Sequence, residues 1–272
     1  MKNMYPTSEK LMNLAKDKAF EYQNSAPFPN IVLENFFNSE LLDEILKEFP
    51  DLSESNSRKY KNKREIKLQG KGELFFGDET KKFMHFLNSE PFLNFLQVLT
   101  GIEEKLVGDP YFIGGGQHET KKDGFLKIHA DFNKHTFLGL DRRINVLIYL
   151  NKDWKDNYGG FFEMWDKEMK SCVKKVPPIF NTMAIFSTTD FSYHGLPDPL
   201  NTPEHISRKS LALYYYSNGR PDNEIINGNE NHGTIFKVRD NNKSDKASMN
   251  IFNNPKLFIK KIISPFRYKK NN

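Results

Sequence analysis

Three residues of this chain have the types and spacing to hold a metal ion. His129 and Asp131 stand two positions apart, and His194 follows much later in the chain. Two imidazole nitrogens and one carboxylate oxygen on one side of a metal leave coordination positions free, an arrangement typical of non-heme Fe(II) centres. An open ferrous centre can bind a co-substrate and O2 together, so these residues favour oxidative chemistry.

The spacing of the first two residues suits an extended strand. Residues i and i+2 of a strand point to the same face, so His129 and Asp131 can be directed at one point. The same spacing also arises by chance in a chain with 7 His and 35 acidic residues. A surface His beside a strand carboxylate is therefore one alternative. Zinc held by three ligands and a water, as in a zinc hydrolase, is another.

A basic residue at the start of a later apolar run extends the pattern. Arg208 comes just before the run 210–216. A guanidinium there can form a bidentate pair with the far carboxylate of a small diacid. Alone, Arg208 would be an ordinary charge at a strand edge. Combined with the three candidate ligands, it favours a site for a metal ion and a dicarboxylate.

The elements that must position these residues change in character near residue 105. Before it, apolar residues recur at helical spacing in 38–49 and 79–99, and Pro50 ends the first of these helices. After it, short apolar runs alternate with turn residues, which indicates an antiparallel sandwich or barrel. The predicted strands are 124–128, 144–150, 159–165, 181–186 and 210–216.

Composition excludes several classes of protein. The apolar share of 38% and the aromatic share of 14% support a real core, and the net charge of +5 is too small for a committed nucleic-acid binder. The single Cys172 excludes an intrachain disulfide and favours a reducing, cytoplasmic setting. No signal peptide and no apolar run long enough for a membrane span are expected.

The positive charge gathers at the C-terminal end. Residues 237–272 carry ten Lys or Arg against two Asp, and the segment 255–263 has a short amphipathic pattern. An anionic partner is one interpretation of this basic extension. A solvated end of the chain, or a helix packed back on the domain, is the other.

The stretch 109–216 resembles the Fe(II)/2-oxoglutarate dioxygenase domain of the prolyl 4-hydroxylase-like superfamily, including bacterial and phage oxygenases. Within it, 144–160 is similar to the oxygen-sensing prolyl hydroxylases through an Ile-Tyr-Leu-Asn-Lys-Asp-Trp motif followed by Gly-Gly. The resemblance implies an α+β fold, a double-stranded β-helix (jelly-roll) core with N-terminal supporting helices. The expected organisation is helical support at 1–105, the dioxygenase jelly roll at 106–220 and a basic extension at 221–272.

The resemblance also implies roles for individual residues. His129, Asp131 and His194 would hold Fe(II), and Arg208 would bind the distal carboxylate of 2-oxoglutarate. Tyr149 matches a tyrosine that contacts the same carboxylate, although a core aromatic is an equal alternative. No separate catalytic acid or base is expected beyond the metal site.

This chain departs from the family pattern at two places. Gln117-His118-Glu119 stands where many members have a co-substrate tyrosine, so that role has no candidate. The loop 197–204 lengthens the gap between His194 and Arg208, which leaves the substrate class open.

The implied reaction is hydroxylation of an unactivated C–H bond with release of succinate and CO2. It would use Fe(II), 2-oxoglutarate and O2, with ascorbate as reductant. A peptide prolyl residue, a glycan and a small metabolite are the substrates considered. The alternative function is a non-catalytic jelly-roll module that binds an anionic partner.

Overall fold

The computed structural model describes residues 4–225, 231–239 and 242–249, and the predicted amphipathic segment 255–263 lies outside these residues. Its helices are α1 (Ser8–Gln23), α2 (Ser39–Lys47), α3 (Asp78–Leu87), α4 (Glu90–Thr100) and α5 (Lys243–Met249). Its strands are β1 (Asn30–Glu34), β2 (Arg58–Lys61), β3 (Glu65–Gln69), β4 (Gly116–Thr120), β5 (Phe125–Ala130), β6 (Asp141–Tyr149), β7 (Phe162–Trp165), β8 (Cys172–Val176), β9 (Thr182–Ser187), β10 (His194–Leu196), β11 (Arg208–Ser217) and β12 (Ile235–Phe236).

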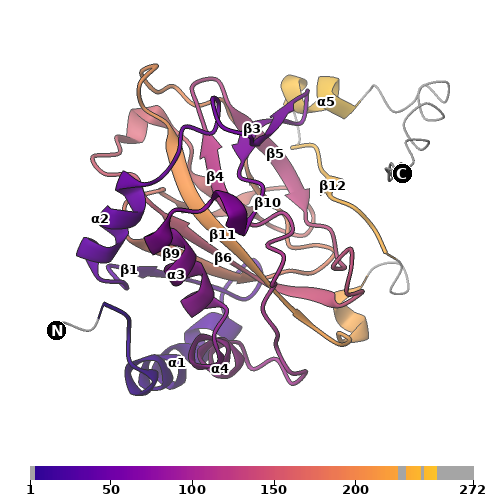
Figure 1. Cartoon of the computed structure of the whole chain (residues 1–272). Coiled ribbons are helices and arrows are strands. Elements are labelled where there is room, and N and C mark those ends of the chain that lie inside the picture. The colour runs from indigo at the N-terminus through magenta and orange to yellow at the C-terminus, as the bar shows by residue number, and fades with distance from the viewer. Residues whose placement is uncertain (1–3, 226–230, 240–241, 250–272) are drawn as a thin grey trace, which may run out of the picture.

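The strands form one antiparallel sheet that folds back on itself, with helices on one side (Figure 1). Its order is β1-β9-β6-β11-β4-β3-β5-β10-β7-β8, while β2 pairs with β3 and β12 with β5. Phe186 of β9 and Phe162 of β7 come from strands far apart in this order, yet their ring centroids lie 5.1 Å apart. The two ends of the sheet therefore face each other across an interior, as the expected jelly-roll core requires.

The predicted helices and strands are confirmed, with shifts at their ends, but the helical region predicted at 79–99 consists of two helices, α3 and α4, separated at Asn88 and Ser89. α2 begins after Asn38, whose side chain accepts hydrogen bonds from the backbone of Glu40 and Leu41. The strand predicted at 159–165 begins only at Phe162, because Gly159 and Gly160 take positive φ angles of 70° and 72°. Such angles are incompatible with a continuous strand.

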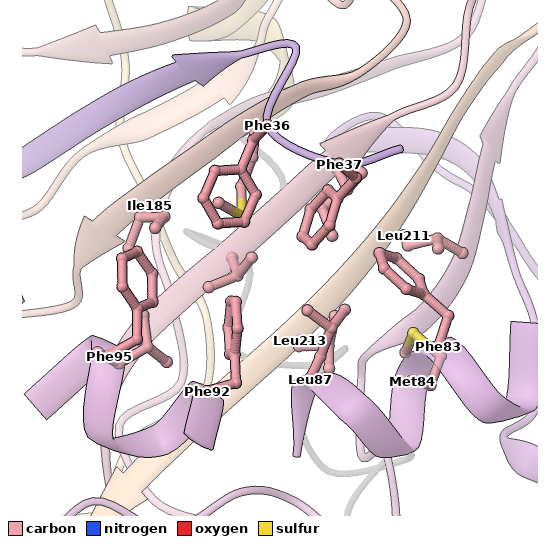
Figure 2. Packing of buried hydrophobic residues seen from close by; sticks show 14 of the residues in the cluster. Phe36, Phe37, Phe83, Met84, Leu87, Phe92, Phe95, Ile185, Leu211 and Leu213 are labelled. Atoms are coloured by element: carbon pink, nitrogen blue, oxygen red, sulfur yellow. The ribbon is translucent and has the colours of Figure 1, made fainter. Parts of the chain in front are cut away.

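The main hydrophobic core lies between the helices and one face of the sheet (Figure 2). Phe83 and Leu87 of α3 and Phe95 of α4 pack against strand residues such as Ile185 and Leu213. Because side chains alternate along a strand, the neighbours of these strand residues point to the other face, into the interior. The helices thus hold the strands from outside, and the interior face carries smaller aromatic and apolar clusters together with polar residues.

Segments outside the expected jelly-roll range also join the sheet. β1 pairs with β9, and β3 pairs with β4 and β5, so residues before 105 supply strands as well as helices. β12, from the C-terminal extension, pairs with β5 opposite Ala130 and His129. Among the described residues, no helix is long and apolar enough to cross a membrane.

Candidate metal centre

Neighbouring antiparallel strands bring the three candidate ligands together. His129 of β5 lies opposite His194 of β10, and Asp131 follows directly after β5. Nε2 of His129 lies 3.6 Å from Oδ1 of Asp131, and Nε2 of His194 lies 3.4 Å from Oδ2. One possible ligand atom from each residue lies within 4.8 Å of the others, so the group has the dimensions of a metal site.

Backbone carbonyl groups set the orientation of both imidazoles. Nδ1 of His129 lies 2.8 Å from the carbonyl oxygen of Lys127, and Nδ1 of His194 lies 2.9 Å from that of Ser192. A carbonyl oxygen only accepts hydrogen bonds, so each Nδ1 carries the proton and donates it. In its neutral form each ring then directs the lone pair of Nε2 toward the carboxylate, as metal-binding histidines require.

The surroundings favour the protonation states that a cation needs. Burial lowers the pKa of His129, and neighbouring His194 lowers it further. Burial alone would raise the pKa of Asp131, but the charge of the neighbouring Arg142 guanidinium holds it well below its usual range. The unprotonated Nε2 of His129 and the ionised carboxylate of Asp131 thus face one another, and a cation between these two residues and His194 would be coordinated by all three.

Two polar side chains of β6 hold the Asp131 carboxylate in place. Nδ2 of Asn145 donates to Oδ2 of Asp131 at 2.8 Å, and Nη2 of Arg142 lies 3.0 Å from the same oxygen. Arg142 also donates from Nε and Nη2 to Oδ1 of Asn145, and its guanidinium carbon lies 3.4 Å from the ring centroid of Tyr214. These contacts leave Oδ1 of Asp131 directed at His129.

A second buried group, Arg208 with Tyr149, occupies the interior face of β11 and β6. Arg208 is 6% exposed, and its Nε donates to the carbonyl oxygen of Gly160 at 2.8 Å. Its guanidinium carbon lies 4.8 Å from the ring centroid of Tyr149. In the described part of the chain, no carboxylate forms an ion pair with Arg208, and the buried Tyr149 hydroxyl has no hydrogen-bond partner.

Gly160 allows the close approach of this arginine. A Cβ built on Gly160 would lie 2.6 Å from Leu200 and 3.2 Å from Cδ of Arg208. No side chain fits there without displacing these neighbours, which explains the second glycine of the Gly-Gly pair.

Packed aromatic rings connect the arginine to the candidate ligands. Tyr149 shares a buried cluster with Phe162 and Phe186. The ring centroids of these two phenylalanines lie 5.5 Å and 4.7 Å from that of His194. The Arg208–Tyr149 pair and the three candidate ligands therefore line the same interior.

Comparison with known proteins agrees with this arrangement. Residues 116–216, which contain all five predicted site residues, match the family model described as the 2OG-Fe(II) oxygenase superfamily. This domain belongs to the 2OG-Fe(II) oxygenase superfamily. The oxygenase domain is accordingly an oxidoreductase of the dioxygenase class, and the family implies Fe(II) and 2-oxoglutarate. No protein of curated function matches the sequence.

Several solved structures share the fold. A Pseudomonas putida prolyl-4-hydroxylase is 14% identical, with a TM-score of 0.53 over 77% of this chain and 100% of that one. A prolyl hydroxylase from Trichoplax adhaerens, solved with a hypoxia-inducible-factor peptide, is 17% identical, with a TM-score of 0.55 over 77% and 91%. A Burkholderia pseudomallei 2OG-Fe(II) oxygenase family protein is 14% identical, with a TM-score of 0.50 over 74% and 90%.

The oxygenase domain also contains histidines outside the ligand group. Nε2 of His135 lies 3.1 Å from Oδ1 of Asp109, and both side chains are buried in a polar contact separate from the candidate ligands. His118 of β4 pairs with Ser210, two residues from Arg208, and therefore lies on the same face as Arg208. Burial lowers the pKa of His118 to about 3, with nearby cations adding to the effect, so this ring is neutral.

Sequence reasoning missed Arg142 and Asn145. The oxygenase domain has a register shift in the pairing of β6 with β11, between Tyr215 and Tyr216. This irregularity allows residues three apart, which face opposite sides of a regular strand, to meet at Asp131. The one signal in the sequence was the presence of polar residues in an otherwise apolar strand.

Proposed function

We propose that the oxygenase domain binds Fe(II) through His129, Asp131 and His194. The observation that carries this proposal is the fixed orientation of both imidazoles, with each Nε2 turned toward the same carboxylate. Two nitrogens, one oxygen and no thiolate favour Fe(II) over a structural zinc site. Asp131 would offset part of the metal charge, and Arg142 would keep its carboxylate from turning away.

For 2-oxoglutarate we propose Arg208 and Tyr149 as the residues that bind the distal carboxylate. A buried guanidinium without a carboxylate partner and a buried hydroxyl without a hydrogen bond are both costly, and one carboxylate would satisfy both. The guanidinium offers a bidentate pair and the hydroxyl a further donor. This fit supports a small dicarboxylate as the co-substrate.

Bound there, Fe(II) and 2-oxoglutarate would supply the activation of O2, with succinate and CO2 as products and hydroxylation of an unactivated C–H bond as the outcome. The chain contributes binding, orientation and the exclusion of water. Phe162 and Phe186 pack against His194 and provide an apolar wall beside the ligands. No separate acid or base residue is assigned.

The proposal also covers the reductant, the cellular location and the substrate. Ascorbate would restore protein that oxidises during uncoupled turnover, and a cytoplasmic location suits a ferrous site and a single free Cys172. A peptide prolyl residue, a glycan or a small metabolite would be the substrate. A binding module without catalysis would need neither the oriented ligands nor a buried Arg208 that lacks a carboxylate partner.

A succinate-release assay tests the reaction. Protein supplied with Fe(II), 2-oxoglutarate and ascorbate is screened against peptide, glycan and metabolite pools. Asp131→Ala should abolish the substrate-coupled release of succinate, while Glu204→Gln, which changes an exposed carboxylate paired only with Lys122, should not. Normal turnover by the Asp131 variant would show that these three residues are not the metal ligands of the reaction.

The role of Arg208 has its own test. Arg208→Ala should raise the 2-oxoglutarate concentration required for half-maximal binding, measured by anaerobic calorimetry on metal-loaded protein. Iron uptake should stay unchanged, because Arg208 is not a ligand. An unchanged 2-oxoglutarate requirement would exclude Arg208 from the site.

A further inference from the structure

One hairpin beside the candidate metal centre concentrates much of the positive charge of the chain. Residues 58–71, which include β2 and β3 and are here named the basic hairpin, contain seven Lys or Arg and one Glu. This excess of six exceeds the net charge of +5 for all 272 residues. Outside the basic hairpin and residues 237–272, the chain has 23 Lys or Arg against 32 Asp or Glu, and is acidic.

The basic hairpin is in contact with the strand that carries His129. β3 pairs with β5 through Glu65 and Ile66, and β12 pairs with the next part of the same strand (Figure 1). The guanidinium carbon of Arg64 lies 5.1 Å from the ring centroid of Phe236. That ring centroid in turn lies 5.6 Å from the ring centroid of His129. Only the side chain of Phe236 thus separates Arg64 of the basic hairpin from His129, a candidate iron ligand.

The outer cations of the basic hairpin are not neutralised. Arg58, Lys61 and Lys63 are exposed, and no ion pair is formed by any of the three within the part of the chain that the structure describes. Some exposed lysines on the helices differ: Lys18 of α1, Lys47 of α2 and Lys82 of α3 each pair with a glutamate three residues away. Unpaired cations of this density favour an anionic partner.

The shape of the hairpin favours a polypeptide among anionic partners. β2 pairs only with β3 among the described strands, so its outer edge presents backbone N–H and C=O groups. An extended peptide can add to such an edge as a further strand. Four strand residues span about 13 Å, which exceeds the length of a small metabolite. Basic side chains along the edge repel another basic strand and attract an acidic one.

The aromatic residue of β2 argues against a nucleic acid. Bases of single strands stack on exposed aromatic faces. The ring of Tyr60 is covered by Lys67, whose Nζ lies 5.0 Å from the ring centroid. Its hydroxyl donates to Gln69. Tyr60 is therefore engaged within the hairpin, and no stacking platform accompanies the positive charge of β2.

We propose that the basic hairpin binds an extended, acidic polypeptide segment and presents it to the metal centre. The inference rests on the proposed function and names the substrate class for the same site. Arg58, Lys61 and Lys63 supply the charge recognition, and the free edge of β2 supplies backbone hydrogen bonds. Arg64 and Phe236 form the connection between this surface and His129.

Fluorescence anisotropy with defined probes tests the proposal. The probes are a fluorescein-labelled oligo-L-glutamate long enough to span β2, an oligo-L-lysine, a neutral Gly-Ser peptide and an oligothymidylate of equal charge. Full-length protein is used at physiological ionic strength, which limits unspecific attraction. The hairpin variant combines Arg58→Gln, Lys61→Gln and Lys63→Gln. The matched control combines Lys10→Gln, Lys16→Gln and Lys105→Gln, which remove three exposed charges from the helical side.

The hairpin variant should bind oligoglutamate at least tenfold more weakly, and the control within twofold of the unchanged protein. Reversing the charge with Lys61→Glu and Lys63→Glu should move the preference toward oligolysine. Equal losses in the two triple variants, or tighter binding of oligothymidylate than of oligoglutamate, would overturn the proposal.

Failure of this proposal can be distinguished from failure of the proposed function. Asp131→Ala should bind oligoglutamate like the unchanged protein, and the hairpin variant should take up Fe(II) like the unchanged protein. If the unchanged protein takes up no iron, this result contradicts the proposed function and leaves the hairpin proposal untouched. Oligoglutamate binding that the hairpin variant retains, together with normal iron uptake, contradicts the hairpin proposal alone.

Discussion

The two faces of β6 have different chemistry although both are buried. Toward the helices the strand presents only aliphatic side chains, Ile144, Val146 and Ile148. Toward the interior it presents Asn145, which contacts Asp131, and Tyr149, which lies beneath Arg208. The difference indicates that the helix-facing side contributes mainly to the stability of the fold. The interior side also buries polar groups that a bound ligand would satisfy.

The largest expected effect is on the helix-facing side. Phe95→Ala removes a fully buried ring of α4 from the main core and should lower the free energy of unfolding by about 3–5 kcal/mol. The Fe(II) affinity of the protein that remains folded should not change, since Phe95 lies behind the sheet. Urea unfolding and an anaerobic iron titration give the two values, and a parallel loss of iron affinity would show that the faces are not separate.

A pair of adjacent arginines sharpens the comparison. Arg142→Met should weaken Fe(II) binding about 10–100-fold, because the Asp131 carboxylate loses its ionic partner. Arg143→Met is the matched control: this arginine is also buried in β6 but pairs with Glu104 and Glu224. It should lower stability without changing iron affinity. Equal iron affinities in the two variants would assign Arg142 a purely structural role.

The interior side should also carry a pH dependence. His118 has a folded-state pKa of about 3, and the unfolded chain has the ordinary value near 6.5. The unfolded state therefore binds the proton first, so stability falls as pH drops below 6.5. Because the ring is only partly buried, His118→Asn should remove about 1–2 kcal/mol of the loss between pH 7 and pH 5. The exposed His205→Asn serves as control, and an identical slope in both variants would contradict the effect.

The smallest effect separates neighbouring residues of one strand. Ile148→Val removes one methylene group from the helix-facing side and should cost about 0.5–1.5 kcal/mol of stability. It should leave 2-oxoglutarate affinity unchanged although Tyr149 is the next residue. A clear change in that affinity, measured by anaerobic calorimetry, would mean that packing on one face controls binding on the other.

The sequence predicted what depends on local spacing. The alternation of strands placed His129 and Asp131 on one face, and the capping residue Asn38 marked the start of α2. The approximate strand positions followed from apolar runs between turns. Arg208 was recognisable because it opens such a run.

What could not be predicted depends on pairing between distant segments. β2 has the sequence Arg-Lys-Tyr-Lys, without the apolar alternation of a strand, and is held by its pairing with β3. The contact of Phe236 with His129 joins segments more than a hundred residues apart. Arg142 reaches Asp131 through a register shift that no local pattern indicates.

The central claim is that His129, Asp131 and His194 bind one Fe(II), and an anaerobic iron titration with metal analysis tests it most directly. The unchanged protein should take up one Fe(II) per chain. His194→Ala should lose this uptake, while His85→Ala, which removes an exposed histidine of α3, should keep it. Iron uptake by His194→Ala equal to that of the unchanged protein, with circular dichroism showing both folded, would contradict the account.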